Sequence, residues 1–229
     1  MGFSDSHHFR KMIAGCCMVV GPLLVLAAFI VSPAIKSNSA AQVAEVARHQ
    51  DRFLMATLLS LAAVVLVIGA TLGLMHMLRE REVAYGHVGG GLAMLGLLAT
   101  TAGIGAQLML WPMVRDGVQL ADVSAWHSLT HDSATVIPLI ICSWFAVIGF
   151  IVLAAGLYRA HAVDWWMAAM LAVGALGITL AGPLESVAVG IVGSALFLVG
   201  GGSIGTMVLR ESDADWEHTP AKARAVAGQ

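Results

Sequence analysis

The sequence predicts an all-α membrane protein, a bundle of six transmembrane helices with both termini in the cytoplasm and a short outer helix before the second span. Of its 229 residues, 59% are hydrophobic and 11% are charged, whereas about a quarter of an average soluble domain is charged. None of the 12 Lys and Arg or 14 Asp and Glu residues falls within the six long apolar runs. A helix of about 20 apolar residues crosses the hydrocarbon core of a bilayer. The six predicted spans are residues 12–32, 53–77, 88–114, 133–157, 165–182 and 186–209.

The same composition excludes several classes of protein. A mean hydropathy of +0.85 excludes a soluble cytosolic domain and a disordered chain. The net charge of −2 gives no electrostatic reason for a nucleic-acid partner. Cys16, Cys17 and Cys142 all fall within predicted spans, where cysteine packs as a small apolar residue. The partner that the composition predicts is the lipid bilayer.

The distribution of positive residues predicts the orientation. Lys and Arg accumulate in cytoplasmic loops. With the N-terminus inside, the inner segments hold eight of these residues and the outer segments hold four. Trp and Tyr, which favour the membrane interfaces, lie near the span boundaries on both sides. We therefore expect a multi-pass protein of the cell (plasma or inner) membrane.

The two longer outer connections carry helix signals. Ser39 and Gln42 fit a capping box, in which each side chain accepts a hydrogen bond from the other residue's backbone N–H. The alanine-rich residues 40–50 that follow predict a short outer helix. In the second outer connection, residues 115–132, Asp132 is a suitable N-cap for the fourth span.

The remaining boundaries divide the chain in two. Residues 182–185, with the sequence GPLE, predict a tight hairpin between the fifth and sixth spans. Residues 1–210 then form a six-helix transmembrane domain. The polar residues 211–229 are expected to be a solvated cytoplasmic tail.

The outer connections also gather imidazole and carboxylate side chains. Together these groups suit a divalent transition metal or general acid–base catalysis. His127 and His131 are four residues apart, so on a helix they would share one face. The alternative is that these residues are solvated interfacial side chains and helix caps, with no metal-binding or catalytic role. The candidate metal ligands are His49, Asp122, His127, His131 and Glu185.

A second group of histidines lies at the cytoplasmic ends of the spans. His76 ends the second span and His87 precedes the third. Two histidines from neighbouring helices can ligate a haem, which makes this pair the candidate haem ligands. The alternative is that they are interfacial residues of a tight, charged turn. The sequence itself requires no cofactor, and a metal or haem belongs only to these alternatives.

The predicted spans contain none of the charged residues that mark proton relays and ion paths in membrane proteins. This absence disfavours a proton-coupled pump or an ion channel. The most polar residue at depth is Gln107 in the third span. We expect it to hydrogen-bond a neighbouring helix, and a ligand contact is the alternative.

Glycine triplets open the third span at Gly89 and occur within the sixth span at Gly200. Glycine in a helix interior costs about 1 kcal/mol relative to alanine, so these positions need a compensating gain. Close helix packing at small residues supplies one, and these small-residue faces could also contact other membrane subunits. A locally unwound span that lines a cavity is the alternative.

One stretch, residues 40–100, resembles a group of small six-span bacterial membrane proteins of unknown function. It reads AAQVAEVARHQDRFLMATLLSLAAVVLVIGATLGLMHMLREREVAYGHVGGGLAMLGLLAT. The similarity lies in a short outer helix, an Arg near the start of the second span, a charged inner turn and a Gly-rich third span. It covers roughly residues 12–110. The resemblance implies the fold and topology and supplies no site residues.

The sequence contains no evident catalytic core. It favours an accessory subunit or a small-molecule binder of the cell membrane. The first alternative is a membrane redox or metal-dependent enzyme, with an outer His/Asp site or a haem near the inner face. The second alternative is a transporter of an apolar or zwitterionic solute, which the glycine triplets and Gln107 suggest.

Overall fold

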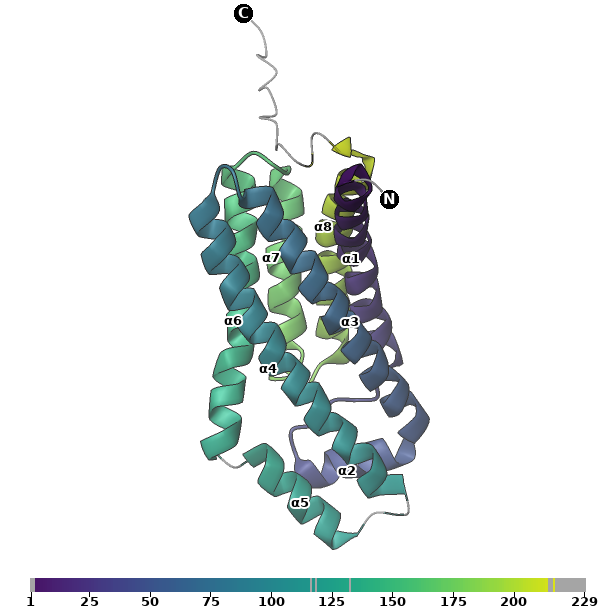
Figure 1. Cartoon of the computed structure of the whole chain (residues 1–229). Coiled ribbons are helices and arrows are strands. Elements are labelled where there is room, and N and C mark those ends of the chain that lie inside the picture. Colours follow the sequence, from purple (N-terminus) through teal and green to yellow (C-terminus); the bar gives the residue numbers. More distant parts are fainter. Residues whose placement is uncertain (1–2, 116, 118, 132, 214–215, 217–229) are drawn as a thin grey trace, which may run out of the picture.

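The computed structural model describes residues 3–115, 117, 119–131, 133–213 and 216, and these residues form eight α-helices and no strand. Two short helices, α2 and α5, lie together across one end of the bundle, and α1 begins and α8 ends at the opposite end (Figure 1). We call these the cap end and the terminal end. The helices are α1 (Phe3–Val31), α2 (Ser39–Arg48), α3 (Gln50–Leu78), α4 (Val83–Arg115), α5 (Leu120–His131), α6 (Ser133–Arg159), α7 (Trp165–Leu180) and α8 (Val187–Arg210).

Five of the described helices, α1, α3, α4, α6 and α8, are long and apolar enough to cross a membrane. The fifth predicted span, residues 165–182, forms the shorter apolar helix α7, with 16 residues. At 1.5 Å per residue this helix is about 24 Å long, which is less than the roughly 30 Å hydrocarbon core. Because α7 is short, the connection between α7 and α8 does not extend as far along the bundle as α2 and α5 (Figure 1).

The short helix predicted before the second span is confirmed as α2, but its cap differs from the prediction. The N-cap is Asn38, whose side chain accepts a hydrogen bond from the Ala41 N–H at 3.0 Å. The Gln42 side chain accepts instead from the Lys36 N–H at 2.8 Å. The capping box therefore does not form at Ser39, because the Asn38 side chain, one residue earlier, already accepts from the first turn of the helix.

In the connection of residues 115–132, Leu120–His131 form a further helix, α5, which the sequence did not predict. Apolar side chains of α2, α4 and α5 pack together at the cap end, with Val43, Leu110 and Trp126 buried among them. Asp132, the predicted N-cap of the fourth span, lies outside the described residues.

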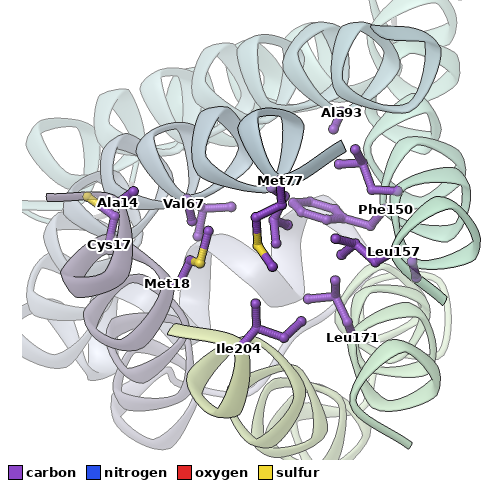
Figure 2. Packing of buried hydrophobic residues seen from close by; sticks show 14 of the residues in the cluster. Ala14, Cys17, Met18, Val67, Met77, Ala93, Phe150, Leu157, Leu171 and Ile204 are labelled. Atoms are coloured by element: carbon purple, nitrogen blue, oxygen red, sulfur yellow. The ribbon is translucent and has the colours of Figure 1, made fainter. Parts of the chain in front are cut away.

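The main core fills the bundle between the long helices. Figure 2 shows buried side chains of the long helices and of α7 meeting in its interior. Phe150 of α6 contacts Phe197 of α8 edge to face, with 5.2 Å between the ring centroids. The converging residues include Met18 from α1, Val67 from α3, Leu157 from α6, Leu171 from α7 and Ile204 from α8.

Glycines allow the helices to pack at backbone distance. A Cβ at Gly205 of α8 would lie 2.8 Å from the Gly15 carbonyl oxygen of α1, and a Cβ at Gly177 of α7 would lie 2.8 Å from the Gly193 Cα of α8. Both α4 and α8 continue as helices through their glycine triplets. The triplets therefore belong to packed, unbroken helices, and the unwound alternative does not occur.

The chain after α8 does not run directly into solvent. Trp216 is only 5% exposed and packs against the main core. The expectation of a solvated segment from Glu211 onward is therefore wrong for this residue, because its indole finds an apolar surface at the terminal end of the bundle. Residues 217–229 lie outside the described residues.

Candidate functional site

A groove opens between α4 and α6 on the side of the bundle. Nearer the terminal end the two helices touch at backbone distance, since a Cβ at Gly89 would lie 2.9 Å from the Leu153 N atom. Toward the cap end they diverge (Figure 1), and Ile137, Ile140 and Ile141 of α6 are exposed. The groove has a volume of about 380 Å³ and is lined by Leu95, Ala99, Pro138, Leu139, Cys142 and Phe145.

The groove is apolar in chemistry. Its one heteroatom-bearing side chain is Cys142, whose thiol is a weak donor. The neighbouring hydroxyls of Thr100 and Thr101 donate to carbonyl oxygens of their own helix, at 2.9 and 2.8 Å. The arrangement can bury apolar surface, and it contains no charged group that could polarise a substrate.

Gln107 does not make the predicted contact with a neighbouring helix. Its side chain is exposed on α4, toward the cap end from Ala99, and forms no hydrogen bond with another described residue. The interhelical bond is absent because α4 and α6 diverge in this part of the bundle (Figure 1).

The structure brings two of the five candidate metal ligands together. His127 and His131 stack on α5, with 4.2 Å between the ring centroids and 21° between the ring planes. The Nδ1 atom of His127 also lies 3.3 Å from the Ser39 Oγ of α2.

The other candidate ligands lie apart or are not described. His49 joins α2 to α3, and its Nδ1 atom lies 3.3 Å from Glu45 Oε1. Glu185 belongs to the connection between α7 and α8, which ends far from α2 and α5 (Figure 1). The side chain of Asp122 is outside the described part of the structure. Within that part, no three His, Cys, Asp or Glu side chains form a group able to hold a metal.

The two candidate haem ligands make separate contacts. The His76 Nε2 atom lies 3.2 Å from the Trp216 carbonyl oxygen, and its Nδ1 atom lies 3.4 Å from Arg79 Nη1. The His87 side chain is exposed, with Nδ1 at 2.9 Å from the Val83 carbonyl oxygen of its own helix. Both ring nitrogens of His76 therefore already have hydrogen-bond partners, and neither is open to an iron ion in this structure.

Sequence reasoning missed a polar cluster at the terminal end. The Lys11 side chain of α1 is buried, with 4% of the residue exposed, and its Nζ donates to the Glu211 carbonyl oxygen at 2.9 Å and pairs with Asp213. His8 Nδ1 lies 3.2 Å from the same carboxylate. Hydrogen bonds from Lys11 and His8 hold the pKa of the Asp213 carboxyl below its ordinary value. The sequence contained one signal for this cluster. The acidic residue Asp213 follows the last predicted span, and Lys11 directly precedes the first predicted span.

The fold and its apolar helices define a class: the chain is a multi-pass α-helical membrane protein. It belongs to the family described as "Domain of unknown function (DUF4386)", whose model matches residues 13–210. The resemblance to membrane proteins of unknown function is thereby confirmed, over more of the chain than residues 12–110. No curated protein and no solved structure matches the chain.

Proposed function

We propose that this protein is a non-catalytic binding protein of the cell membrane that holds one apolar small molecule in the α4–α6 groove. The observation that carries the proposal is the groove itself, whose six lining residues present almost only carbon to a space of about 380 Å³. Ligand sites in proteins commonly measure about 300–1,000 Å³ and are lined mainly by apolar side chains. A hydrocarbon chain or ring system is the chemical class that this lining suits.

Gln107 is the residue that we assign to the polar end of such a ligand. It is exposed on the same helix as Leu95 and Ala99, nearer the cap end, and makes no hydrogen bond with another described residue. An amide inside a bilayer gains from any partner that satisfies its donors and acceptor. A ligand with an apolar body and one hydrogen-bonding end would match both features.

The proposed topology has six crossings, with both termini in the cytoplasm. The start of α1 and the end of α8 lie at the same end of the bundle (Figure 1), as an even number of crossings requires. A helix as short as α7 can cross where the bilayer thins locally or where flanking residues reach the interface. The positive-residue count supports a terminal end that faces the cytoplasm. In this orientation the α4–α6 groove lies in the outer half of the membrane.

Native mass spectrometry of the detergent-purified protein tests the binding function. We expect the wild-type chain to keep one apolar molecule per chain through detergent exchange. Ala99→Trp fills the groove and should lower the bound fraction at least tenfold. The matched control is Ala155→Trp, which places the same side chain in a second apolar groove between α6 and α7 and should leave the bound fraction unchanged.

Two results would overturn the proposal. One is a wild-type protein that carries no apolar molecule after purification in a mild detergent. The other is an equal loss in the Ala99→Trp and Ala155→Trp variants, since both residues lie on the lipid-facing surface and only Ala99 lines the α4–α6 groove.

A further inference from the structure

We propose that His127 and His131 form a two-imidazole clamp for a divalent late-transition-metal ion on the outer surface of the cap end. The two residues are one helical turn apart on α5, and both side chains are exposed. Their rings are nearly parallel, with 4.2 Å between the centroids. Residues four apart lie on one face of a helix. A rotation of the two exposed side chains out of the stack directs both Nε2 lone pairs at a single ion.

The hydrogen bonds around His131 fix which ring nitrogen carries the proton. Its Nδ1 atom lies 3.2 Å from the His127 carbonyl oxygen and 2.9 Å from Thr130 Oγ1. The Thr130 hydroxyl donates to the Trp126 carbonyl oxygen at 2.8 Å, so it accepts from His131. Both partners of Nδ1 are acceptors, and Nδ1 therefore holds the proton of the neutral ring. The lone pair for a metal is then on Nε2.

This arrangement is the one that metal-binding histidines commonly use. Such a histidine donates its other ring N–H to a carbonyl or carboxylate, which orients the ring and makes the ligating nitrogen more basic. In His131 the carbonyl oxygen of His127 accepts that hydrogen bond.

The ring of His127 is positioned from another helix. Its Nδ1 atom lies 3.3 Å from the hydroxyl of Ser39, a buried residue at the start of α2. Ser39 is thus a positioning residue for the clamp. Among the described side and main chains, no hydrogen bond reaches the Nε2 atom of His127 or His131.

The ligand chemistry selects the class of ion. Imidazole suits Cu²⁺, Zn²⁺ and Ni²⁺, and affinity for a given site rises to Cu²⁺ in the first-row series, whereas Mg²⁺ and Ca²⁺ prefer oxygen ligands. Two protein ligands leave the remaining coordination positions to water. The proposed clamp does not need His49 or Glu185 as ligands. It therefore contains fewer residues than the five candidate metal ligands that the sequence indicates.

Titration of the untagged full-length protein with Cu²⁺ or Zn²⁺ at pH 7.5, followed by calorimetry, tests the clamp. We expect one ion per chain, with affinity at least tenfold weaker in His131→Ala and in His127→Ala. The control is His49→Ala, which removes a histidine of the same end that does not contact the pair and should leave the affinity unchanged. The same protein should bind neither Mg²⁺ nor Ca²⁺.

Electron paramagnetic resonance of the Cu²⁺-loaded protein gives a second readout. The wild-type spectrum should show coupling to two imidazole nitrogens, and the His131→Ala spectrum coupling to one. Equal Cu²⁺ affinity in wild type and His131→Ala would overturn the proposal, and so would a loss of affinity in His49→Ala as large as in His131→Ala.

Discussion

The imidazole of His76 stacks on the indole of Trp216, with 4.6 Å between the ring centroids and 21° between the ring planes. The two residues are 140 positions apart, and the His76 Nε2 atom also lies 3.2 Å from the Trp216 carbonyl oxygen. Together with the Lys11–Asp213 pair, this contact fastens Glu211–Asp213 and Trp216, here called the C-terminal segment, to the ends of α1 and α3. The C-terminal segment therefore packs against the terminal end of the bundle.

Trp216→Ala should destabilise the protein, because the indole packs against the main core. Truncation of a buried tryptophan costs about 3–5 kcal/mol, and we expect a loss near the lower figure of about 3 kcal/mol because the residue lies at one end of the bundle. Thermal unfolding in detergent micelles measures the loss. Trp165→Ala is the matched control, since Trp165 is 69% exposed. Equal destabilisation by the two substitutions would contradict the role assigned to Trp216.

The attachment of the C-terminal segment should depend on pH through Asp213. Lys11 and His8 are the basic groups that contact this carboxylate, and their hydrogen bonds lower its pKa from the ordinary 3.8. A lowered pKa in the folded state stabilises the fold fully above the ordinary value, and the stabilisation is lost as the pH falls through the lowered value. The protection of the amides of residues 211–213 against hydrogen exchange, measured relative to the intrinsic rate at each pH, should therefore fall below about pH 3.8.

Asp213→Asn is the control for this pH dependence. The amide does not titrate, so the backbone amides of this segment in the variant should have low protection against exchange already at neutral pH, and this protection should change little on acidification. An unchanged, slow exchange in Asp213→Asn at pH 7 would show that the carboxylate does not hold the segment.

Gly149→Ala should weaken the contact between α4 and α6. A Cβ at Gly149 would overlap the Ala93 backbone and lie 2.6 Å from the Gly89 carbonyl oxygen, so the two helices would have to separate. Overpacking of this kind costs about 1–3 kcal/mol. Gly91→Ala is the control, because a Cβ there meets nothing within 4 Å, and it should be neutral or stabilising by up to about 1 kcal/mol. Chemical denaturation in micelles measures both, and a Gly149→Ala variant as stable as Gly91→Ala would refute the packing argument.

Cysteine labelling tests the proposed topology, and it distinguishes six crossings from five. In a variant without the native cysteines, Ser124→Cys on α5 and Leu184→Cys between α7 and α8 should react with a membrane-impermeant maleimide outside intact cells. Ala84→Cys, in the first turn of α4, should react only after lysis. Leu184 is 58% exposed, so its reactivity reports its side of the membrane. Labelling at Leu184→Cys only after lysis would show that α7 does not cross.

The class of the protein was predictable because its strongest signal is local. The apolar runs exclude every charged residue, and five of them form helices long enough to cross a membrane. The length of α7 was less predictable, because Ala181 and Gly182 continue the apolar run of residues 165–182 while the helix already ends at Leu180. The N-cap of α2 was predicted at Ser39 and is Asn38 in the structure. The sequence did not distinguish the two positions, because both residue types are good N-caps.

The candidate sites depend on contacts that a single sequence does not encode locally. The spacing of His127 and His131 indicated a shared helix face, and the structure stacks the two rings on α5. Nothing in the sequence showed that the α7–α8 connection would leave Glu185 far from them, or that α4 and α6 would separate beyond their glycine contact. Trp216 was overlooked because the surrounding residues are polar, and its partner His76 is 140 positions away.

Photolabelling tests whether an apolar molecule is bound between α4 and α6. The wild-type protein in native membranes is irradiated with an apolar diazirine probe, and the adducts are mapped by peptide sequencing. We expect adducts concentrated on Leu95, Ala99, Leu139 and Cys142, which line the groove, and we expect their loss in the Ala99→Trp variant. Adducts spread evenly over the lipid-facing residues of all helices, unchanged by Ala99→Trp, would contradict the proposal.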